Sequence, residues 1–224
     1  MIIHTFMHIL IGAYLYTLFF RPTNNREKIM IILSGGIIGI SPDITKFFGD
    51  LWLHSILTIP FIGLLFALLL YSLLRINLLK GLWTSMVTVF LSHHLIDYLG
   101  NGINLLYPIS GDEVELDVIP KSMEAIIIFV LLLGFILYLS KLSFKYYIMP
   151  LIVIILLLIV QITSSLTIQH KLDTRLHPAT ITMTPENQLL HWEFDVRLAD
   201  TTIIKGSGAY RDYKIDHTTP PPKE

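Results

Sequence analysis

Long apolar stretches separated by short polar segments fill the first 168 residues. A bilayer core about 30 Å thick takes about 20 residues of helix. The pattern predicts membrane-spanning helices over 3–20, 29–41, 51–74, 81–99, 124–140 and 146–168. The second stretch is short, so a re-entrant hairpin is its alternative. Its Ser34-Gly35-Gly36 and Gly39 would let a neighbouring helix approach closely.

The last quarter of the chain follows a different pattern. Apolar and polar residues alternate from Leu190 to Leu198, which predicts a half-buried strand. Thr180–Thr184 and Gly208–Ile215 are predicted to be further strands. Pro185-Glu186-Asn187 and Gly206-Ser207-Gly208 supply turns between them.

These patterns predict an all-α integral membrane protein with about six transmembrane helices and a small C-terminal antiparallel β appendage. The helical domain spans 1–168 and holds the candidate site described below. The appendage spans 169–224 and ends in a Pro-rich tail, Thr218–Glu224, which is predicted to be disordered.

Composition narrows the classes of function. Hydrophobic residues make up 53% and charged residues 15% of the chain, against about 25% charged in soluble domains, so a single water-soluble globule is excluded. Sixteen Lys and Arg against 17 Asp and Glu give a net charge of -1, which excludes a strongly basic nucleic-acid binder. Because the chain has no cysteine, disulfides, thiolate metal sites and cysteine nucleophiles are excluded as well.

Charge also predicts the orientation in the membrane. Segments 21–28, 75–80 and 141–145 carry seven Lys or Arg, whereas the alternate loops carry only Lys46 and Lys121. The positive-inside rule therefore places the three basic loops in the cytoplasm and both termini outside. The first apolar run precedes its positive charges, the reverse of a signal peptide. We expect a retained first span in a multi-pass protein of the bacterial inner membrane.

Ionisable residues gather at one depth of the predicted spans. His8, Asp43, His54, His93 and Asp97 all fall within about 10 Å of the outer ends. Such groups are costly inside a membrane and are candidates for function. His93 and Asp97 are spaced i,i+4 and share a helix face, while His94 points about 100° away. His4 is spaced i,i+4 from His8 but lies near a helix end expected to fray.

Three imidazoles and two carboxylates form a nitrogen and oxygen set that suits zinc, with manganese, iron or nickel as alternatives. We therefore predict a divalent metal ion at His8, Asp43, His54, His93 and Asp97. A metal with an open position lowers the pKa of its water toward about 7 and creates a nucleophile. Asp43, His93 and Asp97 are the predicted catalytic residues, because a further carboxylate can orient a ligating His or take a proton. Each residue alone could be an interhelical hydrogen-bonding group or a helix end; their common depth favours a shared site.

Short motifs extend this argument over about residues 4–110: His8-Ile9-Leu10-Ile11-Gly12, Ser41-Pro42-Asp43-Ile44-Thr45, Leu53-His54-Ser55 and Ser92-His93-His94-Leu95-Ile96-Asp97. Their order and spacing resemble the YdjM-type, LexA-regulated family of membrane-bound metal-dependent hydrolases. The resemblance implies a metal and hydrolysis but no substrate. Thr45 stands where the family has a second Asp, and Gly49-Asp50 stands where it has a His-Arg pair. These departures put in question a second metal and an arginine contact to substrate. Asp50 is the expected substitute ligand.

The predicted function is a metal-dependent hydrolase at the outer membrane surface, acting on a lipid-like ester or phosphoester because the site lies at headgroup depth. The alternative is a non-catalytic metal-binding protein or an ion or solute transporter that uses the same cluster. A transporter needs polar groups through both leaflets, and the inner halves of these spans are almost entirely apolar. No His-Glu-x-x-His or Gly-x-Ser-x-Gly motif is present.

Overall fold

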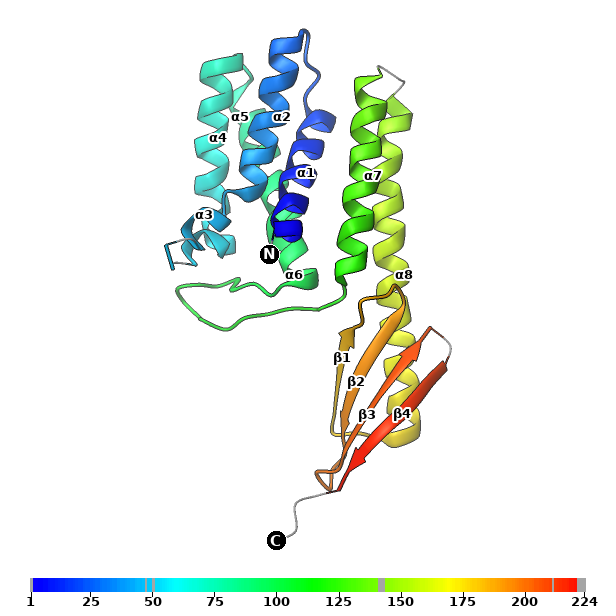
Figure 1. Ribbon diagram of the computed structural model, residues 1–224. Helices are drawn as coiled ribbons and strands as arrows, with labels where there is room; N and C mark the ends of the chain where they lie inside the picture. The colour runs from blue at the N-terminus through cyan, green and yellow to red at the C-terminus, as the bar shows by residue number, and fades with distance from the viewer. Residues whose placement is uncertain (1, 47, 50, 141–143, 211, 221–224) are drawn as a thin grey trace. The chain divides into compact units, whose positions relative to one another are not determined.

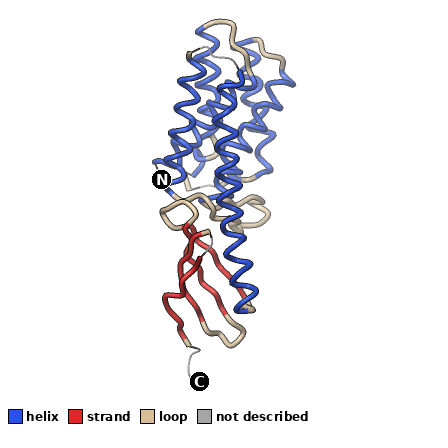
Figure 2. Tube along the Cα trace, turned by 90° about the vertical axis from the view of Figure 1, so that its right-hand side faces the viewer, coloured by secondary structure: helices blue, strands red, loops and turns tan. Residues whose placement is uncertain are grey.

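The computed structural model describes residues 2–220 except 47, 50, 141–143 and 211. The chain forms two compact units. The first comprises Met1–Leu116 and Ile127–Leu151, and the second comprises Asp117–Ile126 and Ile152–Glu224. Figure 1 traces the elements in chain order, and Figure 2 shows that the strands are confined to the C-terminal part.

Helices make up the first unit. They are α1 (Ile2–Phe19), α2 (Asn25–Ile40), α3 (Asp43–Lys46), the 3₁₀ turns η1 (Trp52–His54) and η2 (Ile56–Thr58), α4 (Ile59–Leu74), α5 (Leu78–Val89), the π-helical η3 (Phe90–His94) and α6 (Leu95–Gly100). Parts of α7 (Lys121–Leu139) and α8 (Phe144–Leu176) complete the unit. The elements α5, η3 and α6 follow one another without a break, so helical structure covers the predicted span 81–99.

The predicted helix over 51–74 is wrong in its first eight residues. Residues 52–58 form the two 3₁₀ turns, and the α-helix begins only at Ile59. The hydroxyl of Ser55 accepts a hydrogen bond from the Leu57 N–H, which favours a turn at this point. Pro60 occupies the first turn of α4, where its missing N–H costs no helical hydrogen bond.

Four segments are long and apolar enough to cross a membrane. They are Ile2–Phe19, Ile56–Leu74, Lys121–Leu139 and Tyr146–Leu176. The chain is thus a mostly helical membrane protein with four candidate spans. Helix α2 has 16 residues. It begins at Asn25, four residues before the predicted apolar stretch 29–41, because Asn24 caps it there.

That cap explains where α2 begins. The side chain of Asn24 accepts a hydrogen bond of 2.9 Å from the Glu27 N–H. The Glu27 carboxylate in turn accepts hydrogen bonds from the backbone N–H and hydroxyl of Thr23, at 2.7 and 2.8 Å. These bonds from Thr23 hold the pKa of Glu27 below its ordinary value. Reciprocal bonds of this kind satisfy the first N–H groups of a helix.

Glycines allow α1 and α2 to pack backbone against backbone. A Cβ atom added at Gly12 would lie 2.9 Å from the Gly39 Cα and would also meet the Gly35 carbonyl. A Cβ atom added at Gly39 would lie 3.3 Å from the Gly12 Cα and would meet the His8 carbonyl. The predicted close approach along the small residues of 29–41 is therefore confirmed. This contact places the C-terminal end of α2 beside His8.

We expect Gly39→Ala to destabilise the first unit. The added methyl has no space, and overpacking of this kind costs about 1–3 kcal/mol. The measurement is the thermal unfolding midpoint in detergent, compared with Gly111→Ala, where an added Cβ meets nothing within 4 Å. Equal midpoints for the two variants would contradict the tight α1–α2 contact.

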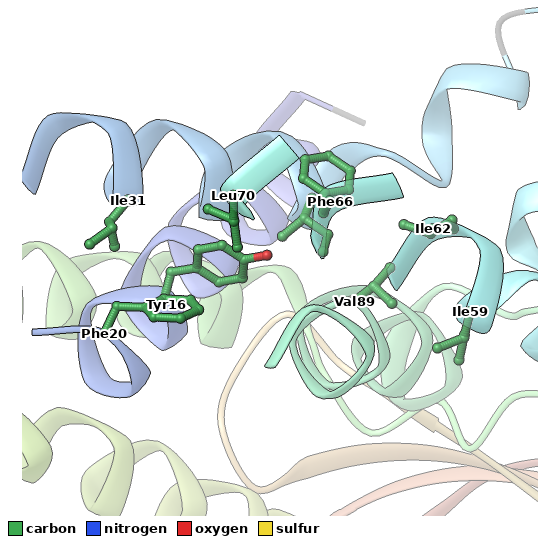
Figure 3. Packing of buried hydrophobic residues seen from close by; sticks show 9 residues of the cluster. Tyr16, Phe20, Ile31, Ile59, Ile62, Phe66, Leu70 and Val89 are labelled. Carbon is green, nitrogen blue, oxygen red and sulfur yellow. The ribbon is translucent and has the colours of Figure 1, made fainter. Parts of the chain in front are cut away.

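A buried apolar cluster holds α1, α2, α4 and α5 together. Its members are Tyr16, Phe20, Ile31, Ile38, Ile59, Ile62, Phe66, Leu70 and Val89. Figure 3 shows their side chains converging from neighbouring helices. The Tyr16 hydroxyl is satisfied within this region by Ser85 Oγ at 2.6 Å. This packing fixes the helix ends from which the candidate site is built.

The second unit contains most of α8 and a four-stranded antiparallel sheet in the order β1-β2-β3-β4. The strands are β1 (Thr180–Pro185), β2 (His191–Arg197), β3 (Ile203–Ala209) and β4 (Asp212–Thr219). Trp192, Phe194 and Val196 alternate as buried residues along β2, as the period-2 pattern predicts. The Trp192 indole N–H donates to Ser164 Oγ at 3.2 Å, so the sheet packs on α8, which continues past residue 168 to Leu176.

Three details of the predicted appendage are wrong. The segment Gly208–Ile215 is not one strand, because β3 ends at Ala209 and the antiparallel β4 begins at Asp212. Gly206-Ser207-Gly208 is not a turn but lies inside β3, where Gly206 pairs with Phe194. A side chain at Gly206 would collide with the Phe194 ring, so this glycine provides room for packing rather than a bend. Thr218 and Thr219, predicted to be disordered, pair with Ile204 and Ile203. The remainder of the predicted tail, 221–224, lies outside the described residues.

Candidate metal centre

The structure brings all five sequence-predicted side chains to one end of the first unit. His8 comes from the first half of α1, and Asp43 is the first residue of α3. His54 ends η1, just before α4, while His93 and Asp97 come from η3 and α6. Figure 1 shows the beginning of α1 together with α3 and α6 at this end.

Asp97 lies at the centre of the cluster and is 1% exposed. Its Oδ1 is 2.8 Å from His4 Nε2 and 3.1 Å from His8 Nε2. Its Oδ2 is 3.3 Å from His93 Nε2 and 3.8 Å from His54 Nε2. Each oxygen of this one carboxylate therefore faces a different pair of imidazoles.

Asp43 closes the cluster on the side of His54 and His93. Its Oδ1 lies 3.3 Å from His54 Nε2 and 3.8 Å from His93 Nε2, and the two Nε2 atoms are 3.3 Å apart. Bonds of 2.0–2.2 Å to a tetrahedral zinc ion place ligand atoms about 3.3–3.6 Å from one another. The two spacings of 3.3 Å fall in this range, and the 3.8 Å between Asp43 Oδ1 and His93 Nε2 is slightly longer.

Asp43 is also the most open member of the cluster, with a side chain 15% exposed. Partial burial alone would raise the pKa of its carboxyl. The hydrogen bond from His54 outweighs burial and holds this pKa below its ordinary value. Asp43 is therefore an anionic group at the accessible edge of a buried cluster.

Backbone carbonyls fix the protons of two histidines. His8 Nδ1 lies 2.6 Å from the Ser92 carbonyl oxygen, and His93 Nδ1 lies 3.1 Å from that of Gly39. Because a carbonyl oxygen only accepts, each Nδ1 carries a proton and donates it. The neutral ring then presents a lone pair on Nε2. Both Nε2 atoms face the Asp97 carboxylate, so a lone pair there is repulsive unless a proton on Nε2 or a metal ion lies between the two groups.

Buried atoms of the cluster that lack hydrogen-bond partners are consistent with a metal ion between these side chains. Among the described residues, His8 Nε2 and Asp97 Oδ2 face the cluster and are buried without a hydrogen-bond partner. Such groups cost about 1–3 kcal/mol each when they are left unpaired. Three overlapping groups can hold an ion: His4, His8 and Asp97; His8, Asp43 and His93; and His54, His93 and Asp97. The donor set is the nitrogen and oxygen chemistry that zinc and related ions bind.

A π turn shapes the segment that carries His93 and His94. The Phe90 carbonyl accepts from the Leu95 N–H, five residues on, and the Ser92 hydroxyl donates to the Thr88 carbonyl at 2.7 Å. Turns of this type are frequent at functional sites. His94 points away as predicted, with its ring nitrogens 3.4 and 3.3 Å from the carbonyl oxygens of Val89 and Ser55.

His4 is the cluster member that sequence reasoning missed. It is 9% exposed, and the signal that could have found it is its i,i+4 spacing from His8. Thr45, which stands at the position of the expected second Asp, uses its hydroxyl locally by donating to the Pro42 carbonyl at 3.4 Å. Asp50, the predicted substitute ligand, lies outside the described residues.

These features define a polytopic membrane protein with a buried cluster of histidines and aspartates that can hold a metal ion. The family model for YdjM inner membrane proteins matches residues 3–168, which include the whole cluster. The chain therefore belongs to the YdjM inner membrane protein family, as the motifs predict. No curated protein matches the chain, and no solved structure matches it.

Proposed function

We propose that this protein is a metal-dependent hydrolase that acts at the outer face of the inner membrane on a lipid-like ester or phosphoester. The observation that supports a metal is the pair of histidines, His8 and His93, whose Nδ1 atoms lie against backbone carbonyls and whose Nε2 atoms face Asp97. Backbone carbonyls commonly fix metal-ligating imidazoles in this way.

The residues that would hold the ion are His4, His8, Asp43, His54, His93 and Asp97. When bound, a divalent ion supplies Lewis acidity and lowers the pKa of a coordinated water toward about 7. Gly39 and Ser92 orient two imidazoles through their carbonyls, and each oxygen of Asp97 faces one pair of histidines. Zinc is the proposed metal because the spacing of Asp43, His54 and His93 fits its short bonds.

The proposed substrate is amphiphilic because the cluster lies near helix ends and not at the middle of the spans. Asp43 is its most exposed member, so a substrate headgroup reaches the cluster from the Asp43 side. The other five side chains are buried, which keeps bulk water from competing at the reacting centre.

Hydrolysis explains the cluster better than transport does. A transport path needs polar or ionisable groups along the length of the spans. The sequence contains no His, Asp, Glu, Lys or Arg at 9–19 of α1, at 29–40 of α2, throughout α4 or at 81–92 of α5 and η3. The ionisable groups of these helices are therefore confined to their ends.

We expect the purified protein to hydrolyse one class of phospholipid or lipid-linked ester and to lose this activity on chelation. Adding zinc or manganese should restore it. His93→Ala should abolish turnover, whereas His217→Ala, an exposed histidine of β4, should retain it. The measurement is product release from a panel of lipid substrates in detergent. Turnover that survives exhaustive chelation would exclude the proposed mechanism.

We further propose six spans, in which α2 and the continuous helical segment 78–100 join the four long apolar helices. With six crossings, the basic segments 21–28, 75–80 and 141–145 all face the cytoplasm and both termini face outside. The candidate metal centre then lies toward the outer side as well, because His8 is in the half of α1 away from the loop 21–28 and Asp97 is near the end of the segment 78–100 away from the loop 75–80.

Cysteine labelling tests this orientation, since no native cysteine interferes. In intact cells an impermeant thiol reagent should label Ser207→Cys but not Asn25→Cys. Both positions should react after the membrane is permeabilised. Labelling of Asn25→Cys alone in intact cells would reverse the topology. Equal labelling of both positions would exclude the odd number of crossings that the six-span arrangement places between them.

A further inference from the structure

A second polar site lies in the first unit, away from the candidate metal centre. It is a cavity of about 450 Å³ lined by the C-terminal end of α1, residues 21–24, the first turn of α2, and Tyr138 and Tyr147. This volume falls within the range of about 300–1,000 Å³ that is typical of small-ligand sites. Among the residues that the structure describes, no Asp or Glu lines the cavity.

Two cations line the cavity without a counter-ion. Arg21 and Lys28 form no ion pair with any carboxylate of the described residues. Lys28 Nζ instead sits 4.4 Å from the centre of the Tyr138 ring. Glu27, their nearest acidic neighbour in sequence, already accepts two hydrogen bonds from Thr23. The cavity is therefore cationic and suits an anion.

A buried hydroxyl gives independent support for a ligand. Tyr138 is 9% exposed, and its hydroxyl has no hydrogen-bond partner among the described residues. A buried hydroxyl without a partner costs free energy that an acceptor on a ligand would recover. Asn25 also lines the cavity from the first turn of α2, where the helix dipole favours a negative charge.

We propose that this cavity binds the phosphate of an anionic phospholipid from the surrounding bilayer. Leu18 and Phe20 line it beside the two cations, so its wall is partly apolar, as an amphiphile requires. Phe19 and Leu139, at the ends of α1 and α7, are 40% and 57% exposed and offer apolar surface for acyl chains. Basic pockets between membrane helices are known to hold lipid headgroups in this manner.

The site does not depend on metal binding or hydrolysis. None of its lining residues belongs to the His and Asp cluster. The phosphate could also come from a free anion in solution, which shares the same chemistry at Arg21 and Lys28. The apolar wall and the exposed residues beside it favour the lipid, and the experiment below separates the two sources.

The test is native mass spectrometry of the delipidated full-length protein in detergent with added dioleoylphosphatidylglycerol or dioleoylphosphatidylcholine. We expect one tightly retained phosphatidylglycerol on the wild type, and at least about a tenfold loss of this retention in Arg21→Gln/Lys28→Gln. The matched control is Arg26→Gln/Arg75→Gln, which removes the same charge from exposed positions outside the cavity. Tyr138→Phe should weaken retention without changing the charge.

Two results would overturn the proposal. Equal loss in the control and cavity variants would show attraction by general surface charge. Displacement of the lipid by millimolar inorganic phosphate, with phosphate itself retained, would assign the cavity to a free anion. If the thermal unfolding midpoints of the cavity variants equal that of the wild type, a loss of lipid retention arises at the site. If Arg21→Gln/Lys28→Gln has a lower midpoint, the lipid retention of Tyr138→Phe gives a second readout.

Discussion

Asp97→Asn is expected to remove metal binding and, with it, turnover. Asparagine keeps the size of the side chain but lacks the charge that faces His4, His8, His54 and His93. Its NH₂ group can donate to a histidine lone pair, so the fold should survive while the cation loses its central anionic partner. We expect metal affinity to fall by more than about 100-fold, because losses of 10–100-fold are typical of groups that only support a ligand.

Elemental analysis of the detergent-purified variant and a competition titration with a chromogenic chelator measure this effect. The matched control is Asp195→Asn, which removes an exposed carboxylate paired with Lys205 at 2.6 Å in the sheet. This control should keep the wild-type metal content. A loss of only about tenfold in Asp97→Asn would make Asp97 a positioning residue for the histidines rather than a ligand.

Much of the candidate site could be predicted because helices impose simple geometry. The i,i+4 spacing of His93 and Asp97 places them on one face, and their Nε2 and Oδ2 atoms lie 3.3 Å apart. Placing successive apolar stretches in opposite directions across a bilayer brings His8, Asp43 and His54 to the same end. The small residues of α2 likewise indicate its close contact with α1, which the glycine geometry confirms.

The remaining features of the candidate site and of the sheet depend on tertiary contacts, which local sequence patterns do not encode. His4 was discounted as part of a fraying end, yet α1 begins at Ile2 and tertiary packing buries this histidine against Asp97. The carbonyls of Gly39 and Ser92 decide the tautomers of His93 and His8, but every residue has a carbonyl. Gly206 looks like a turn residue until the Phe194 ring that occupies its space is known.

Hydrophobicity alone also does not predict where every membrane helix begins or where its α-helical geometry is interrupted. Hydrophobicity predicts the long helices α1, α4, α7 and α8 well, because length and composition suffice. The start of α2 is set by the Asn24 and Glu27 cap, which lies outside the apolar stretch. The π turn at 90–94 interrupts the regular α-helix between α5 and α6, although the apolar pattern continues through it.

Metal removal is expected to lower the thermal stability of the helical unit. An ion that binds only the folded state stabilises it by about 4 kcal/mol when its concentration is a thousand times the dissociation constant. For a domain of this size, that corresponds to a fall in the unfolding midpoint of about 10 °C on chelation. The buried atoms His8 Nε2 and Asp97 Oδ2 give the physical reason, since they lack hydrogen-bond partners among the described residues.

Two signals separate the units in this experiment. Circular dichroism at helical wavelengths follows the helices, while Trp192, buried on the sheet and bonded to Ser164, reports the second unit when Trp52 and Trp83 are replaced by Phe. The helical signal should shift on chelation and recover with zinc, whereas the Trp192 signal should shift less because no cluster residue lies in its unit. In Asp97→Asn the helical midpoint should not respond to zinc at all. A zinc-dependent shift that persists in Asp97→Asn would place the stabilising ion elsewhere in the protein.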